Sequence, residues 1–123
     1  MDKKAVLIVD DSEVVRMALE QFVRDLGYDV ILAPNGDAAI QKINGPGLAF
    51  YAALTDYKMP GGRDGEDVVK AAKERRIKKI ILMSAAMGED AVIVRRVAAK
   101  YDVDFLSKPF SVEYLRFLLS EKG

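Results

Sequence analysis

The sequence predicts an α/β protein in which one parallel sheet is covered by helices on both faces. Five short apolar runs, rich in β-branched residues, alternate with five longer stretches whose apolar residues repeat at the 3.6-residue period of a helix. Strand–helix units in strict alternation are typical of such a sheet. The chain of 123 residues has the length of one domain and contains no internal repeat or linker, so we expect a single domain over residues 1–123.

The apolar runs are the candidate strands, in chain order residues 5–9, 28–32, 49–54, 79–83 and 105–106. The candidate helices are residues 12–26, 35–44, 65–75, 89–101 and 111–120. Ser12 and Ser111 suit the N-caps of the first and last helices, and Gly27 suits the C-terminal end of the first. The second helix begins at Asn35 or Asp37, and a Gly-Pro-Gly segment ends it.

The composition restricts the chemistry available to the chain. The 19 basic and 19 acidic residues cancel, so the total charge gives no argument for nucleic acid or membrane binding. No apolar run approaches the ~20 residues of a spanning helix and no signal pattern opens the chain, so we expect a cytoplasmic protein. Cysteine and histidine are absent, which excludes a disulfide, a thiolate nucleophile, a Ser-His-Asp triad and a phosphohistidine on this chain.

Polar side chains follow four of the predicted strands at their carboxyl ends. They are Asp10 and Asp11 after the first strand, Asp56 after the third, Ser84 after the fourth and Lys108 after the fifth. The carboxyl ends of parallel strands meet at one edge of the sheet, where open α/β sheets bind ligands. Three carboxylates repel one another unless a hard cation such as Mg²⁺ neutralises them. Each residue alone is more simply a solvated charge or a turn residue, but their coincidence at one edge predicts a site for a phosphoryl group.

The segments VLIVDDS, LTDYKMP, ILMSA and FLSKPF resemble the receiver domain of two-component response regulators, in order and nearly in spacing. The resemblance implies a flavodoxin-like doubly wound sheet of five strands in the order 2-1-3-4-5, with five helices. It implies that Asp56 accepts a phosphoryl group from a sensor histidine kinase or phosphotransfer protein in a Mg²⁺-dependent reaction. The protein then signals to a downstream protein effector through changed contacts, without binding nucleic acid or entering a membrane. Any enzymatic activity is self-directed phosphotransfer and autodephosphorylation.

The same resemblance assigns roles to the individual site residues. The implied Mg²⁺ ligands are the carboxylates of Asp10, Asp11 and Asp56 and the backbone carbonyl of Lys58, with Asp10 acting mainly through water. Ser84 moves toward the phosphoryl group, and Lys108 holds it. The peptide bond between Lys108 and Pro109 is commonly cis in this family.

Three features depart from the family pattern. The loop before the third predicted helix is one residue longer than usual and carries a glycine pair at 61–62. Phe105 lies where many members carry a rotating tyrosine, so any switching of this ring relies on packing alone. Lys58 and Ala86 flank the implied path of attacking water and offer no carboxylate or amide to orient it. We therefore expect slow self-dephosphorylation.

The last predicted helix carries two sets of apolar residues. The candidate core stripe consists of Val112, Leu115, Leu118 and Leu119. Tyr114 and Phe117 lie on a different face, where they form a candidate docking or dimer patch near Phe105 and the fourth helix.

Two other functions are compatible with parts of the pattern. The alternatives to a receiver are a phosphorylation-independent interaction module on the same fold and, further behind, a phosphohydrolase with an aspartate nucleophile. The complete set of site residues argues against the first. The second is disfavoured because Lys58 stands two residues after Asp56, where phosphatases of the haloacid-dehalogenase type carry an acid.

Overall fold

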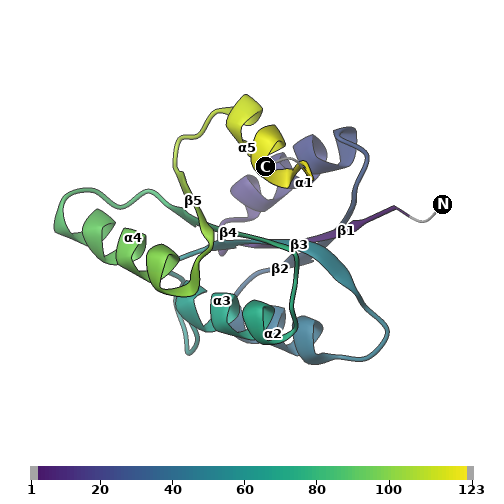
Figure 1. Ribbon diagram of the computed structural model, residues 1–123, viewed down its shortest axis with the longest axis horizontal. Helices are drawn as coiled ribbons and strands as arrows, with labels where there is room; N and C mark the ends of the chain where they lie inside the picture. Colours follow the sequence, from purple (N-terminus) through teal and green to yellow (C-terminus); the bar gives the residue numbers. More distant parts are fainter. Residues whose placement is uncertain (1–2, 122–123) are drawn as a thin grey trace.

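The computed structural model describes residues 3–121 and contains a fully parallel sheet in the order β2-β1-β3-β4-β5 (Figure 1). The strands are β1 (Ala5–Val9), β2 (Asp29–Ala33), β3 (Phe50–Asp56), β4 (Lys79–Ser84) and β5 (Asp104–Ser107). The helices are α1 (Glu13–Asp25), α2 (Gly36–Asn44), α3 (Gly65–Glu74), α4 (Glu89–Tyr101) and α5 (Val112–Leu119). The predicted α/β class and the strand order implied by the resemblance are confirmed.

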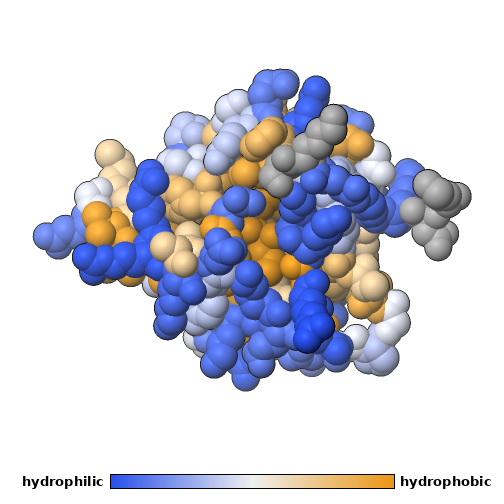
Figure 2. Space-filling view, viewed as in Figure 1, coloured by the Kyte–Doolittle hydropathy of each residue, from blue (hydrophilic) through white to orange (hydrophobic). Residues whose placement is uncertain are grey.

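The helices form two layers, one on each face of the sheet (Figure 1). Helices α1 and α5 pack on one face, and α2, α3 and α4 pack on the other. Hydrophilic side chains cover the outer side of α2 and α3 in Figure 2, which is consistent with amphipathic helices whose apolar side faces the sheet. Within residues 3–121, no helix has the length and apolar character needed to span a membrane.

The helix starts agree with the capping residues in the sequence. The side-chain oxygens of Ser12, Asn35 and Ser111 each accept a hydrogen bond from the backbone N–H three residues later. Asn35 rather than Asp37 is therefore the cap of α2. The second strand begins one residue later than predicted, because Tyr28 still donates its N–H to a carbonyl of α1.

One position of the predicted stripe on the last helix is wrong. The three leucines of the stripe are buried, but Val112 is 48% exposed. Val112 is the first residue of α5, and it lies at the rim of an open groove beside α1. Tyr114 and Phe117 are exposed, as predicted for a second face of this helix.

The polar residues at the strand ends belong to the sheet itself. Asp56 and Ser84 are the last residues of β3 and β4 and still pair with the neighbouring strands, which makes both strands longer than predicted. Asp10 extends the ladder beyond β1, because its N–H donates to the carbonyl of Ala33 at 3.2 Å. The sheet therefore fixes the backbone from which these three side chains emerge.

Gly65 lets α3 begin directly against the end of β3. Its N–H donates to the carbonyl of Tyr57 at 2.7 Å, which closes the longer loop noted in the sequence. A Cβ atom at Gly65 would lie 2.3 Å from the backbone oxygen of Asp56 and 2.5 Å from the Cα of Tyr57. Because these neighbours are backbone atoms at the end of β3, which the sheet holds in place, they have little room to move.

We predict that Gly65→Ala lowers the free energy of unfolding by about 1–3 kcal/mol, the usual cost of overpacking. The matched control is Gly62→Ala in the same loop, where the nearest atom is a carboxylate oxygen of Asp37 at 3.3 Å, at the end of a flexible side chain. We expect a change within about 0.5 kcal/mol for this control. Urea unfolding followed by circular dichroism measures both. Equal stability of the two variants would contradict the close approach.

Candidate functional site

Asp10 is the most constrained member of the site. Asp10 is 1% exposed, so the interpretation that it is a solvated loop residue is wrong. Its neighbour Asp11 is exposed. One carboxylate oxygen accepts the N–H of Ser12 at 2.9 Å, and the other accepts Lys108 Nζ at 2.7 Å. The guanidinium of Arg16 donates to the backbone carbonyl of Asp10 at 2.6 Å. A buried carboxylate is tolerated here because both of its oxygens are hydrogen-bonded.

Three carboxylates converge at the carboxyl edge of the sheet. One oxygen from each of Asp10, Asp11 and Asp56 lies within 4.8 Å of the other two. The three residues run from buried through partly buried to exposed, so one side of the cluster opens to solvent. An all-oxygen donor set with room for water ligands fits Mg²⁺, which keeps several waters when it binds to proteins. The residues present therefore fit the predicted cation.

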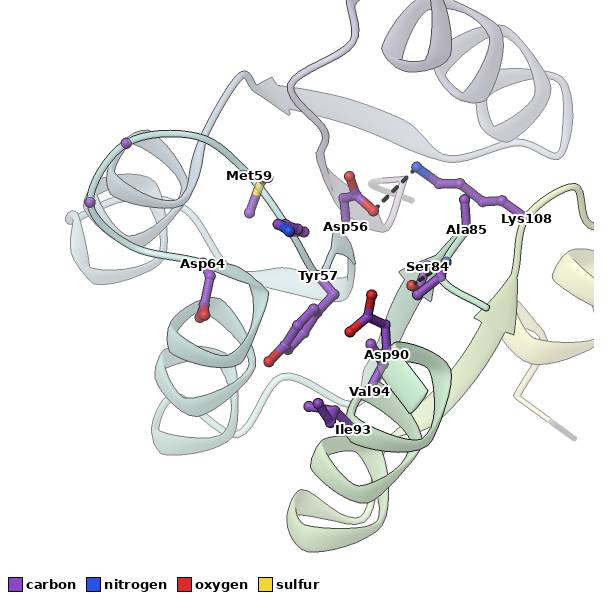
Figure 3. A pocket seen from close by; sticks show the side chains of 14 residues that line it. Asp56, Tyr57, Met59, Asp64, Ser84, Ala85, Asp90, Ile93, Val94 and Lys108 are labelled. Atoms are coloured by element: carbon purple, nitrogen blue, oxygen red, sulfur yellow. Dashed lines mark hydrogen bonds and ion pairs between the residues drawn. The ribbon is translucent and has the colours of Figure 1, made fainter. Parts of the chain in front are cut away.

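Lys108 lies between two of these carboxylates. Its Nζ is 2.7 Å from Asp10 Oδ2 and 3.3 Å from Asp56 Oδ1, and its side chain is 18% exposed (Figure 3). Burial alone would lower the pKa of Lys108, but the hydrogen bond with Asp10 and the charge of Asp56 outweigh burial and raise that pKa. The lysine is therefore charged over the whole physiological range. The peptide bond between Lys108 and Pro109 is cis, as the resemblance implied.

Asp56 is a destabilised anion in the absence of a metal. Burial raises the pKa of Asp56, Lys108 lowers it, and the charges of Asp10 and Asp11 raise it further. The net effect is a raised pKa, so Lys108 does not fully offset burial together with the charges of the two neighbouring acids. A divalent cation bound by the cluster would supply the missing positive charge.

Ser84 and Lys108 are linked through the backbone at the ends of β4 and β5. The N–H of Lys108 donates to the carbonyl of Ser84 at 2.8 Å. The Ser84 hydroxyl oxygen accepts the N–H of Ala86 at 2.9 Å, which leaves the hydroxyl proton available for donation. Ser84 is buried, and Figure 3 shows it beside Asp56 and Lys108 at the same edge.

An open cavity of about 760 Å³ extends from Asp56 toward α4. Its lining consists of Asp56, Tyr57, Lys58, Met59, Gly61, Gly62, Asp64, Ser84, Ala85, Ala86, Asp90, Ile93, Val94 and Lys108. Lys58 is exposed and Ala86 is partly buried, so both departures from the family pattern border the same cavity as the acidic cluster. Phe105 does not line it and lies on the edge strand β5, half-buried.

The sequence interpretation missed two contacts that support the site. Arg16, one turn into α1, was not assigned a role, although a basic residue shortly after an acidic pair was the available signal. Asp64 forms a capping box with Asp67 at the start of α3. The Asp-x-x-Asp spacing before the helix was visible in the sequence and is a recognised capping pattern.

The sequence and the fold were compared with known proteins. The family profile described as response regulator receiver domain matches residues 6–119. The chain is 36% identical to the transcriptional regulatory protein ResD of Bacillus subtilis over 106 residues, covering 86% of this chain and 42% of that protein. It is 33% identical to the chemotaxis protein CheY of Thermotoga maritima over 108 residues, covering 87% of each.

A cyclic di-GMP phosphodiesterase of Thermotoga maritima is 30% identical over 115 residues, which cover 94% of this chain and 30% of that protein. The chain thus spans less than half of the length of this relative and of ResD. Among solved structures, a CheY-like receiver domain protein from Methanospirillum hungatei superposes with a TM-score of 0.82 at 25% identity, covering 98% of this chain and 97% of that one.

We predict that Asp56→Asn raises the melting temperature of the metal-free protein by roughly 3–5 °C, the shift that about 1 kcal/mol produces in a domain of this size. The folded-state pKa of Asp56 is raised, so its ionised form destabilises the fold above that pKa. The difference between the two proteins should therefore shrink as the pH falls through the raised pKa and be gone below the ordinary carboxyl pKa, where Asp56 is protonated in both the folded and the unfolded protein. Calorimetry with a chelator at several pH values measures this.

Asp90→Asn is the control for that experiment, because Asp90 borders the same cavity outside the acidic cluster. Its melting temperature should stay at the wild-type value. An unchanged or lowered melting temperature for Asp56→Asn would show that carboxylate repulsion at this edge is negligible.

Proposed function

Since the chain belongs to the response regulator receiver domain family, we propose that Asp56 accepts a phosphoryl group from a phosphohistidine of a partner protein. Members of this family receive signals in two-component systems, and the chain is a receiver in this sense. The observation that carries the proposal is the grouping of three carboxylate oxygens within 4.8 Å beside the charged Lys108. This arrangement combines a nucleophile, a cation-binding cluster and a fixed positive charge.

In the proposed reaction, a carboxylate oxygen of Asp56 attacks phosphorus while the bond from phosphorus to the partner's imidazole nitrogen breaks. The imidazole leaves and takes up a proton. Mg²⁺, held by the acidic cluster and the Lys58 carbonyl, would neutralise negative charge on the phosphoryl oxygens and lower the repulsion between them and the carboxylates. Lys108 donates to one phosphoryl oxygen, and the Ser84 hydroxyl is within the same edge to donate to another.

The transfer changes the partners of Lys108 and Ser84. Before transfer, Lys108 is bonded to Asp10 and Asp56, and the Ser84 oxygen is bonded to its own loop at Ala86. A phosphoryl group on Asp56 competes for both side chains. We propose that the resulting shift reaches a protein effector through the exposed face that carries Tyr114 and Phe117.

We predict that acetyl phosphate with Mg²⁺ adds one phosphoryl group to the wild type and none to Asp56→Asn, measured by intact-mass spectrometry. Asp90→Asn, which alters a carboxylate in the same cavity, should still be labelled. Labelling should also disappear when a chelator removes the metal.

The outcomes of that experiment separate the rival functions. Absence of an adduct, together with a fold that does not respond to beryllofluoride, would point to a phosphorylation-independent interaction module. Continuous release of phosphate from varied small esters would point to a phosphohydrolase.

We also predict that the phosphorylated protein loses its phosphate slowly, over minutes or longer after the donor is removed. Lys58 and Ala86 border the cavity beside Asp56 and present neither a carboxylate nor an amide to orient water. Lys58→Asn and Ala86→Glu should therefore shorten the lifetime, and Lys70→Asn on the exposed side of α3 should not. A half-life of seconds for the wild type, followed by intact mass, would contradict the role of this pair.

A further inference from the structure

We propose that Arg95 is a positioning residue that holds the ring of Phe105 and thereby opposes the structural change that accompanies phosphorylation. The guanidinium carbon of Arg95 lies 4.6 Å from the centroid of the Phe105 ring, over its face. This distance is within the range of a cation–π interaction. The inference rests on the proposed function of Asp56, and it assigns the control of Phe105 to a residue of α4 that the sequence interpretation did not single out.

The contact fixes a ring at the boundary between core and solvent. Phe105 is half-buried on the edge strand β5 and packs against the core cluster that includes Val94, Val97 and Ala98 of α4. Arg95 comes from the same helix and is exposed, and its guanidinium makes no ion pair or hydrogen bond within residues 3–121. The ring is therefore held both by packing against this core cluster and by the Arg95 charge.

The ring shares a backbone ladder with the site. Phe105 pairs with Leu82 on β4, two residues before Ser84. Lys108, three residues after Phe105, donates its N–H to the carbonyl of Ser84 at 2.8 Å. A change in the partners of Ser84 and Lys108 thus acts on the ends of the two strands that carry the ring.

The strength of the contact suits a reversible restraint. An exposed cation–π pair changes an equilibrium by about two- to five-fold. In this proposal the ring leaves Arg95 when the phosphoryl site is occupied, so the Arg95–Phe105 contact stabilises only the unoccupied state. Removing the guanidinium should therefore favour the occupied state by the same two- to five-fold, because the coupling free energy between the contact and the site is reciprocal. Loss of a nearby positive charge would by itself lower the affinity of the site for an anion, which is the opposite effect.

The test compares Arg95→Gln with Arg96→Gln, which removes the same charge from the next residue of α4. Arg96 is exposed, and its guanidinium makes no ion pair or hydrogen bond within the described part of the chain. The probe is beryllofluoride with Mg²⁺, titrated by isothermal calorimetry. We expect Arg95→Gln to bind it about two- to five-fold more tightly than the wild type and Arg96→Gln to bind equally or more weakly. In a Phe105→Leu background, Arg95→Gln should no longer tighten binding.

The ring itself provides a second readout that does not depend on the probe. The aromatic NMR signals of Phe105 in the metal-free protein should shift in Arg95→Gln and stay in place in Arg96→Gln. Equal effects of the two arginine variants on both readouts would overturn the inference. A wild type that fails to bind beryllofluoride at all would overturn the proposed function instead, and the NMR comparison would then decide the positioning role of Arg95 alone.

Discussion

The repulsion among three carboxylates at the ends of β1 and β3 is the constraint on which the rest of this structure depends. Asp10, Asp11 and Asp56 are brought within 4.8 Å by strands that the sheet holds side by side, and Lys108 is the cation placed between them. The pKa of Asp56 is raised, first by burial and then by the charges of Asp10 and Asp11, and Lys108 offsets these effects only in part. The site is therefore under electrostatic tension in the metal-free protein. A divalent cation bound by the cluster would lower this repulsion, and the proposed phosphoryl group on Asp56 would change it again.

The backbone around the cluster is correspondingly rigid. Asp10, Asp56 and Ser84 emerge from paired positions of the sheet, and Gly65 lets the following helix close directly on the strand end. Loops would give way to the repulsion, whereas ladder positions keep the charges close together. Phe105 lies on the outer strand of the same sheet, so the site and the Arg95–Phe105 contact are connected through the pairing of β4 with β5.

Much of this arrangement was predictable from the sequence because it follows from local pattern. Apolar periodicity indicated the order of the elements, capping residues indicated the starts of α1, α2 and α5, and the position of Asp56 at a strand end indicated the expected site. Contacts made by long side chains across elements were not predictable in the same way. The acidic pair shortly before Arg16 pointed to a nearby basic residue but not to its contact with the Asp10 carbonyl, and no spacing in the sequence indicated that Arg95 reaches a ring on another element.

The burial of Asp10 was also hidden, because adjacent aspartates look alike until the ladder places one inside and one outside. Val112 was misplaced for a related reason. A helical period predicts which face is apolar, but it does not say where along the sheet the first turn begins.

The bond between Lys108 and Asp10 joins residues 98 positions apart and so has a consequence for folding. The first and third strands can pair before the fifth strand is added, since they are closer in sequence. Any partly folded state with that pairing holds the three acids together without their lysine. In such a state the last strand–helix unit would dock onto a core whose charges attract Lys108, and the cluster is complete only when almost the whole chain is in place.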